Sequence, residues 1–236
     1  MDTATPARFE LYGMGSPNVR KILLMLEELE APYDVKLVHV FSAEQFTPGY
    51  RALNPFSKVP VLVDRSAGGE AGYPVFESGA ILIYLAETFG RLLPAAGPER
   101  YETLKWLFGQ TSNIGPMLGQ FNHFRGQTDQ AYGQERYGSI SRRLLEILDE
   151  RLGTTPYLAG EAYTVADVAT YHWAGYVDVY KWDWADFPNL ARWRGDIGRR
   201  PAAQREAEAL KRLYAQGADS IADASKENLD KFWWRR

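Results

Sequence analysis

The stretch that decides the fold is Asn54-Pro55-Phe56-Ser57-Lys58-Val59-Pro60-Val61-Leu62-Val63-Asp64, followed after a Gly-rich segment by Val75-Phe76-Glu77-Ser78-Gly79-Ala80. The first part predicts a turn that leads into a strand. A proline cannot donate a hydrogen bond to a neighbouring strand, so Pro60 is expected on an edge strand or at a strand's first residue, where an extended ligand can pair with the free edge. The second part predicts a short strand that ends at Ser78, a good helix N-cap. We therefore expect a ligand to bind along this edge of the sheet.

The residues before this stretch predict a strand, a helix and a second strand. Arg8 to Tyr12 is the first strand candidate, Ser16-Pro17 is a strong helix start, and Tyr33 to Val40 is the second strand candidate, which gives a βαβ unit. Residues 43–53 predict a short helix. With the two strands around the Gly-rich segment and a helix at 79–89, the order βαβ-α-ββ-α is typical of a thioredoxin-like layer, in which helices cover a mixed sheet.

The second half of the chain predicts helices alone. Residues 99–124 form a long helical stretch that Gly115-Pro116 should kink, and further helices are expected at 134–152, after Thr164, at 189–199 and at 202–216. Thr164 and Asp167 have the spacing of a capping box. The fold class is therefore α/β plus all-α: a thioredoxin-like domain at 1–90, a linker at 91–98, an all-helical domain at 99–217 and a polar tail at 218–236.

Composition excludes several classes of function. A net charge of -3 without a long basic block offers no footprint for nucleic acid or an anionic membrane. No apolar run approaches the ~20 residues that span a bilayer, and Met1 to Pro6 does not resemble a leader, so a cytoplasmic protein is expected. The chain has no cysteine, so any thiol chemistry must use a thiol from a bound molecule. Its three histidines lie far apart, and no metal site is expected.

Motifs in both halves carry a resemblance to a known family. Val59-Pro60, Glu77-Ser78 and Thr164-Val165-Ala166-Asp167, in this order, resemble the cytosolic glutathione transferases over nearly the whole chain. Within that superfamily, the longer motifs are similar to the Nu class, which includes bacterial glutathione-dependent disulfide-bond reductases and is related to the yeast nitrogen regulator that forms prions. These motifs are Ser16-Pro17-Asn18, Phe56-Ser57-Lys58-Val59-Pro60, Phe76-Glu77-Ser78-Gly79-Ala80-Ile81-Leu82, Trp106-Leu107-Phe108-Gly109-Gln110, Gly115-Pro116-Met117-Leu118-Gly119-Gln120 and Glu135-Arg136-Tyr137.

The resemblance implies a homodimer, a C-terminal domain of the glutathione transferase type, and glutathione, reduced or oxidised, as the cofactor without a metal. Ser78 and the free amides after it would hold the γ-glutamyl carboxylate, and Glu77 would hold the ammonium. Val59 would pair its backbone with the cysteinyl unit, which requires a cis bond before Pro60.

The remaining contacts implied for glutathione come from both halves of the chain. Lys58 and Gln45 would reach the glycine carboxylate. Gln110 and Arg136 would complete the site from the helical domain, where Arg136 is a candidate for contact with a second glutathione.

The glutathione sulfur is expected at the helix N-terminus that begins with Pro17. There the helix dipole, the Ser16 hydroxyl and the Asn18 side chain would favour thiolate over thiol. The Nu pattern has threonine in place of Ser16, and the sequence leaves open whether Ser16 is a helix cap or a catalytic group. A hydrophobic wall for the second substrate is expected from Met14, Met117, Phe121, His123, Phe124, Trp173 and Tyr176.

The favoured activity is glutathione-dependent disulfide reduction, in which two bound thiols act in turn. One alternative is a glutathione transferase or glutathione lyase that acts on a hydrophobic electrophile or thioether. Another is a non-catalytic glutathione-binding regulatory protein, although the chain lacks the Asn/Gln-rich arm of the yeast relative. The natural second substrate, the number of glutathiones per subunit and the role of the tail at 218–236 stay open.

Overall fold

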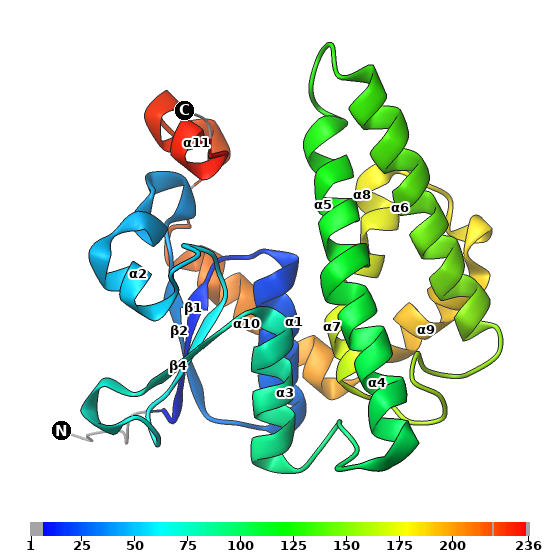
Figure 1. Cartoon of the computed structure of the whole chain (residues 1–236), viewed down its shortest axis with the longest axis horizontal. Coiled ribbons are helices and arrows are strands. Elements are labelled where there is room, and N and C mark those ends of the chain that lie inside the picture. The colour runs from blue at the N-terminus through cyan, green and yellow to red at the C-terminus, as the bar shows by residue number, and fades with distance from the viewer. Residues whose placement is uncertain (1–6, 219, 235–236) are drawn as a thin grey trace. The chain divides into compact units, whose positions relative to one another are not determined.

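Four strands form one mixed sheet in the order β2-β1-β3-β4 (Figure 1). β1 (Phe9–Gly13) and β2 (Tyr33–Leu37) are parallel, and α1 (Pro17–Leu29) connects them, so the βαβ unit is confirmed. β3 (Val61–Asp64) is antiparallel to β1, and β4 (Tyr73–Phe76) is antiparallel to β3. This computed structural model describes residues 7–218 and 220–234. The predictions that fall on Met1 to Pro6, on 219 and on 235–236 lie outside the described residues.

Pro60 lies directly before an internal strand. β3 has β1 on one side and β4 on the other, and its pairing with both begins at Val61. The alternative that placed Pro60 on an edge strand is therefore wrong, while the alternative at a strand start agrees with the structure, because the missing N–H falls outside the ladder. The Val59–Pro60 peptide bond is cis, as the resemblance implied.

Short helical turns cover one face of the sheet. The single helix predicted at 43–53 is wrong in detail: the structure has η1 (Val40–Ser42), η2 (Glu44–Phe46) and α2 (Pro48–Leu53). Ala43 interrupts the winding because it adopts a left-handed φ of 65°, and Thr47 is extended. These turns join an apolar cluster with the sheet, formed by Val38, Val40, Tyr50, Val61 and Val63. Local hydrogen bonds shape the η1–η2 segment, and packing on this cluster holds it against the sheet.

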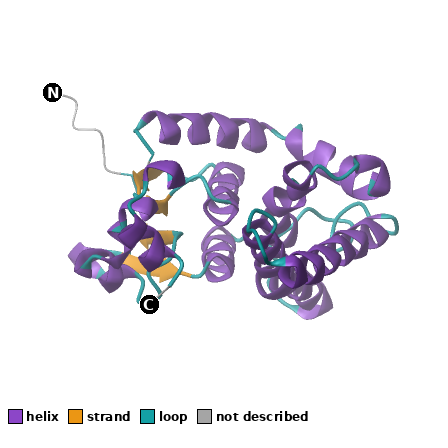
Figure 2. Cartoon of the chain, turned by 90° about the horizontal axis from the view of Figure 1, so that it is seen from above, coloured by secondary structure: helices purple, strands orange, loops and turns teal. Residues whose placement is uncertain are grey.

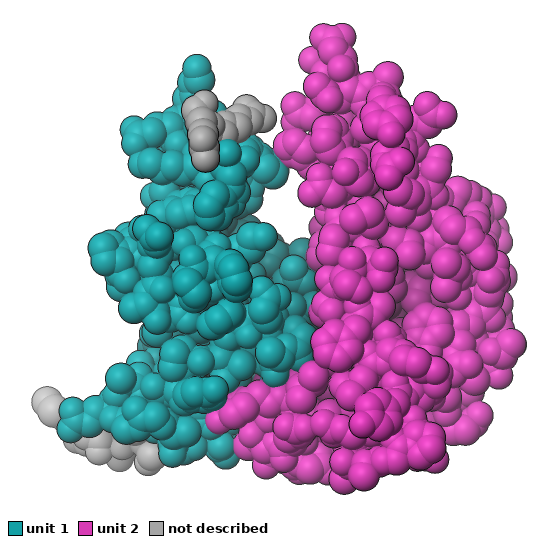
Figure 3. Space-filling view, in the orientation of Figure 1, with its two compact units in different colours: residues 1–81, 204–236 teal, residues 82–203 magenta. Residues whose placement is uncertain are grey.

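The contacts divide the chain into two compact units, coloured in Figure 3. One consists of residues 1–81 and 204–236, and the other of residues 82–203. The first includes most of α10 (Pro201–Ala215) and all of α11 (Lys226–Phe232). Glu206 on α10 accepts two hydrogen bonds from Arg20 on α1, at 2.9 and 3.1 Å. The domain boundaries expected from the sequence stay predictions.

Helices are the regular elements of the described residues of the second unit, which also has an isolated β-bridge between Tyr157 and Gly160. The strands that Figure 2 colours all belong to the sheet. Its elements follow α3 (Ser78–Phe89), which begins in the first unit. They are α4 (Gly97–Gly109), α5 (Gly115–Phe124), α6 (Ala131–Leu152), α7 (Val165–Ala174), α8 (Tyr176–Tyr180) and α9 (Pro188–Gly198). None of the helices that the structure describes has both the length and the apolar character of a membrane span.

The kink expected at Gly115-Pro116 takes the form of a π-helical turn just before it. Residues Gln110–Ile114 wind as η4, and the Gly115 N–H donates to the Gln110 carbonyl. Pro116 has no N–H for the carbonyl four residues earlier, and its ring needs extra room there. The wider turn supplies that room, and such turns are frequent at functional sites.

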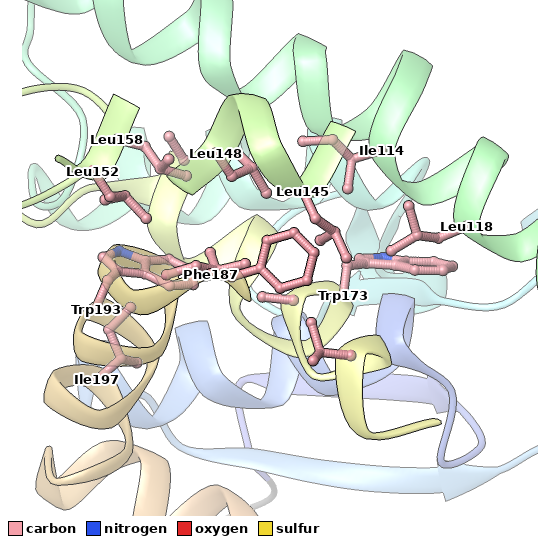
Figure 4. Packing of buried hydrophobic residues seen from close by; sticks show 14 of the residues in the cluster. Ile114, Leu118, Leu145, Leu148, Leu152, Leu158, Trp173, Phe187, Trp193 and Ile197 are labelled. Carbon is pink, nitrogen blue, oxygen red and sulfur yellow. The ribbon is translucent and has the colours of Figure 1, made fainter. Parts of the chain in front are cut away.

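The core of the second unit is built around large aromatic side chains (Figure 4). Trp193 and Phe187 are fully buried among leucines of α5 and α6, and the Trp193 Nε1–H donates to Asp167 Oδ1 at 2.8 Å. The predicted capping box at the start of α7 is present, with Thr164 and Asp167 bonding each other's backbone groups. Asp167 therefore joins the start of α7 to the centre of this core.

Candidate functional site

Two buried side chains hold the turn that precedes β3. The Tyr50 hydroxyl donates to the Lys58 carbonyl at 2.9 Å, and Asn54 Nδ2 donates to the same oxygen at 2.7 Å. Asn54 Oδ1 also accepts from the Phe56 N–H at 2.9 Å. These bonds fix the Lys58 peptide and leave its side chain exposed. The sequence analysis missed Tyr50 and Asn54 as positioning residues, although an asparagine two residues before Phe56 is a common turn signal.

Val59 presents its backbone at the point where the sheet ladder has not yet begun. The pairs of β3 with its neighbours start at Val61, and the side chain of Val59 packs against the apolar cluster beneath the strand. The buried Pro60 ring follows it. An extended ligand can therefore pair with Val59 at the start of β3 without displacing a strand.

Glu77 and Ser78 form the junction between β4 and α3. Glu77 is exposed and adopts a left-handed φ of 65°, and its carbonyl accepts from the Ile81 N–H at 2.9 Å. Ser78, predicted as the N-cap, is the first residue of the helix, one position further in. A positive φ at a residue other than glycine is costly and is found most often at functional sites. Here it presents a carboxylate beside a helix N-terminus, which attracts anions.

A buried lysine interacts electrostatically with Glu77 at this junction. Lys21 is only 1% exposed, and burial lowers its pKa to about 7, while the negative charge of Glu77 opposes the shift. Lys21 lies three residues after Asn18 on α1, so the two share one face of the helix. The sequence analysis missed this residue, because a lysine in a helical pattern is usually solvent-exposed.

Ser16 occupies the N-cap position of α1 but does not act as a side-chain cap. Its backbone is extended, with φ -82° and ψ 155°, and its hydroxyl makes no capping hydrogen bond. Its carbonyl accepts from the Val19 and Arg20 N–H groups at 3.0 and 2.9 Å. Asn18 is half-buried in the first turn, and Met14 packs against the same apolar cluster as Val59. The hydroxyl is therefore not committed to the helix end.

Gln45 is braced inside the η1–η2 segment. Its side chain is buried, and Nε2 donates to the Val40 carbonyl at 3.0 Å. Its Oε1 is buried without a hydrogen-bond partner. An amide oxygen accepts hydrogen bonds and does not attract a carboxylate. The predicted contact with a glycine carboxylate must therefore use the second N–H of Nε2.

Gln110 and Arg136 belong to the helical unit. Gln110 is fully buried at the first residue of the π-helical turn, and a Cβ at Gly115 would lie 2.8 Å from its Nε2. Arg136 is exposed on α6, with Nη1 3.5 Å from the Tyr132 hydroxyl. It lines a pocket of about 300 Å³ with Phe124 and Tyr137. This pocket combines a cation with aromatic walls.

The residues predicted as a hydrophobic wall are divided between the two compact units. Met14 is in the sheet unit, whereas Met117 and the others are in the helical unit. Trp173 is largely buried in the helical core and stacks with Tyr176 at 5.0 Å between ring centroids. Phe124 stacks with Tyr137 near Arg136. The ring contacts of the remaining members join Phe121 to Tyr180 and Trp182, and His123 to Phe124.

Another pocket lies in the sheet unit, and it contains none of the predicted site residues. It measures about 470 Å³ and is lined by Tyr33, Arg205 and Arg212, among others. Its polar groups pair with each other: Tyr33 and Arg205 both donate to Glu27, at 2.6 and 2.7 Å. Within residues 7–218 and 220–234, no group of histidine or carboxylate side chains could hold a metal ion. The residues that could bind a ligand therefore lie at the starts of α1 and α3 and in the turn before β3.

The chain belongs to the glutathione S-transferase family. Residues 15–88 match the N-terminal domain of that family, and residues 132–196 match its C-terminal domain. The mixed sheet with its helices and the helical unit agree with this assignment. The resemblance drawn from the sequence, and the fold class that it implied, are confirmed.

Three relatives extend this assignment. The chain is 40% identical over 218 residues to the disulfide-bond oxidoreductase YfcG of Escherichia coli (strain K12), which covers 91% of this chain and 99% of YfcG. It is 36% identical to a glutathione transferase of Burkholderia graminis solved with two glutathione molecules bound per subunit (TM-score 0.79; 89% of this chain and 92% of the other). It is 34% identical to a Pseudomonas putida glutathione transferase solved with one glutathione disulfide per subunit (TM-score 0.77; 87% and 93%).

Proposed function

We propose that the protein is a glutathione-dependent disulfide-bond reductase. The observation that carries the proposal is the serine at position 16: in a chain without cysteine, its hydroxyl lies at the N-terminus of α1 and is not used as a cap. A helix N-terminus stabilises a thiolate, and here that thiolate must belong to a bound molecule. The name of the Escherichia coli relative and the ligands of the solved relatives support disulfide chemistry with glutathione.

The residues of the sheet unit fit the three parts of glutathione. Ser78 and the first amides of α3 would bind the γ-glutamyl carboxylate, and Glu77 the ammonium. The free backbone of Val59 would pair with the cysteinyl amides. Lys58 is exposed and would bind the glycine carboxylate, which Gln45 would also contact through Nε2. The fit is supported by the strained backbone of Glu77, which presents its carboxylate beside the start of α3.

Glutathione supplies the thiols. Two molecules of it and one disulfide exchange to give glutathione disulfide and two substrate thiols, so that the glutathione sulfurs are oxidised and the substrate sulfurs are reduced. Ser16 would donate a hydrogen bond to the sulfur at the start of α1, and Asn18 would support it from the first turn. Gln110 and Arg136 would bind glutathione from the helical unit, where the pocket beside Arg136 suits a carboxylate.

The wall for the second substrate and the assembly belong to the same proposal. The wall would be lined by Met14, Met117, Phe121, His123, Phe124, Trp173 and Tyr176. Trp173 and Tyr176 would act as its rigid aromatic base.

We expect a homodimer in the cytoplasm. The exposed rings of Phe56 and Phe108, each 55% exposed, are candidates for the subunit contact. Sedimentation analysis of the purified protein measures the assembly directly.

Calorimetry and two activity assays test the proposal. The protein should bind reduced and oxidised glutathione, and it should reduce 2-hydroxyethyl disulfide faster than it conjugates chlorodinitrobenzene. Ser78→Ala should weaken glutathione binding by about 1 to 3 kcal/mol, because a charged ligand group loses a hydrogen bond, whereas the exposed Ser139→Ala should leave it unchanged. Absence of binding by the folded wild type contradicts the proposal, and faster conjugation indicates the transferase alternative.

A further inference from the structure

The C-terminal helix α11 packs on η1 in the sheet unit, as Figure 1 shows for the red helix next to the blue turn that precedes α2. Two aromatic pairs make this contact. The rings of Phe232 and Phe41 lie 5.1 Å apart, and those of Trp234 and Phe46 lie 5.8 Å apart in an edge-to-face arrangement. Phe232 also packs against the apolar cluster that contains Val40.

These contacts lie on both sides of Gln45 in the chain. Phe41 is in η1, whose Val40 carbonyl accepts the hydrogen bond from Gln45 Nε2, and Phe46 is the residue after Gln45. The segment consists of two three-residue turns joined by Ala43 at a φ of 65°, and its backbone N–H groups donate to carbonyls in or next to the segment, such as that of His39. These local bonds fix the shape of the turns, whereas their position over the sheet depends on what packs against them.

The helix α11 also depends on this packing. It has seven residues and one side-chain cap, Ser225, which accepts from the Asn228 N–H at 3.1 Å. Isolated helices of this length are not stable in water. The aromatic contacts therefore stabilise α11 and η1–η2 together, and a loss on one side loosens the other.

We infer that α11 and the turn that follows it are a positioning element for the glycyl end of the glutathione site, in which Phe232 and Trp234 hold the segment that carries Gln45. The inference rests on the proposed function, which places the glycine carboxylate beside Gln45 and Lys58. It gives the tail a specific role: recognition of the third residue of the tripeptide. The sulfur end, at Ser16 and Asn18, belongs to a different helix, so the tail should change affinity and leave the turnover of bound glutathione unaltered.

The test compares two ligands in the full-length protein. Glutathione has the glycyl residue, and γ-glutamylcysteine lacks it, so the ratio of their dissociation constants measures recognition at that end. Phe232→Ala should reduce the preference for glutathione by about fivefold, the scale of one lost aromatic contact, with an unchanged affinity for γ-glutamylcysteine. KM for glutathione should rise by the same factor, while kcat for 2-hydroxyethyl disulfide stays constant.

Two further variants make the result decisive. Trp234→Ala should act in the same direction, and its ring is 66% exposed, so the substitution leaves the fold intact. Ile221→Ala removes an exposed apolar side chain from the same tail and should change neither ligand. Hydrogen exchange of the 40–46 amides should accelerate in both aromatic variants and stay at the wild-type rate in Ile221→Ala.

The outcomes separate the inference from the proposed function. If the wild type binds glutathione and both aromatic variants keep its preference over γ-glutamylcysteine, the inference is overturned and the proposed function stands. An equal loss for both ligands, or a fall in kcat alone, also overturns it, because the tail would then act on the site as a whole or on the sulfur end. If the wild type binds neither ligand, the proposed function fails, and the inference fails with it.

Discussion

Two single residues, Ser16 and Asn18, place a hydroxyl and an amide at the start of α1. The Ser16 hydroxyl makes no capping bond, so its removal should cost the helix little. Its removal should instead affect whatever the helix N-terminus stabilises. A loss of turnover without a loss of stability would therefore distinguish a catalytic role of Ser16 from the helix cap that the sequence also allowed.

Asn18→Ala should leave the affinity for glutathione nearly unchanged and lower kcat by about 10- to 100-fold, because the lost contact stabilises the thiolate more than the bound thiol. Steady-state kinetics with 2-hydroxyethyl disulfide and calorimetry with glutathione measure the two effects separately. Ser16→Ala is the companion variant and should lower kcat in the same way. Unchanged turnover in Asn18→Ala removes that residue from the mechanism.

Lys21 should make stability depend on pH. Its pKa is lowered from 10.5 to about 7 by burial, against the opposing charge of Glu77. Between these values the unfolded chain binds the proton and the folded chain does not, so the free energy of unfolding should rise with pH through this window. From pH 7 to pH 9 the wild type should gain about 2 kcal/mol relative to Lys21→Met, as measured by urea unfolding.

The exposed Lys226→Met serves as the control for Lys21. Its pH dependence of stability should follow that of the wild type, since the Lys226 side chain is exposed. Parallel curves for wild type and Lys21→Met would show that the buried lysine is not the source of the effect.

At the scale of elements, the capping box of α7 contributes more than a helix end. Asp167 is fully buried and accepts from the Leu158 N–H, the Thr164 N–H and the Trp193 indole N–H, each at 2.8 to 3.0 Å. Burial raises its pKa, and these bonds oppose the shift. The carboxylate therefore joins a loop, a helix start and the aromatic core of Figure 4.

Asp167→Ala should lower the free energy of unfolding by about 3 kcal/mol or more, because three buried donors lose their acceptor at once. Urea denaturation followed by tryptophan fluorescence measures the loss. Trp193→Phe removes one of the donors and most of the cost of leaving it unpaired, so the double variant should lose less than the sum of the two single losses. A loss below about 1 kcal/mol in Asp167→Ala contradicts this account.

The elements show which features a single sequence can supply. Ser16-Pro17, Pro60 and Thr164 act on their nearest neighbours, so their positions at element starts could be predicted. The turns of residues 40–53 could not, because the left-handed Ala43 has no local signal. Pro60 illustrates the same limit: its missing N–H excludes the ladder but does not say whether the following strand is internal.

The residues of the candidate site also divide into those with a local sequence signal and those whose role depends on tertiary packing. The family motifs led to Glu77, Ser78 and Val59, whose strained or free backbone the structure describes. Lys21 and Phe232 were missed as contributors, because burial of the first and docking of the second are tertiary facts. No local periodicity distinguishes a buried lysine from an exposed one. The roles of the predicted site residues stay predictions until a ligand is measured.

At the scale of the whole molecule, residues far apart in the chain form one unit. Glu206 is almost fully buried and accepts from Arg20 across 186 positions of sequence. Arg205 pairs with Glu27 beside it. Both pairs join α10 to α1, and residues 204–236 belong to the compact unit that contains the sheet.

Glu206→Ala should lower the free energy of unfolding by about 1 to 3 kcal/mol, because Arg20 loses a paired acceptor that is shielded from water. Glu208→Ala on the same helix is the matched control: its pair with Lys211 is exposed and should contribute almost nothing. Urea unfolding of both variants gives the comparison. Equal losses would mean that the Arg20 pair adds no more than a surface ion pair.

The division of the chain into 82–203 and the two flanking segments also fixes the order in which a ribosome supplies each part. Synthesis completes every residue of the helical unit before any residue from 204 onward has been made. During that interval the residues of all four strands have been made, but Glu206, whose carboxylate is buried, and the aromatic residue Phe232 of α11 have not. The unit translated first is thus the last to have its full set of partners.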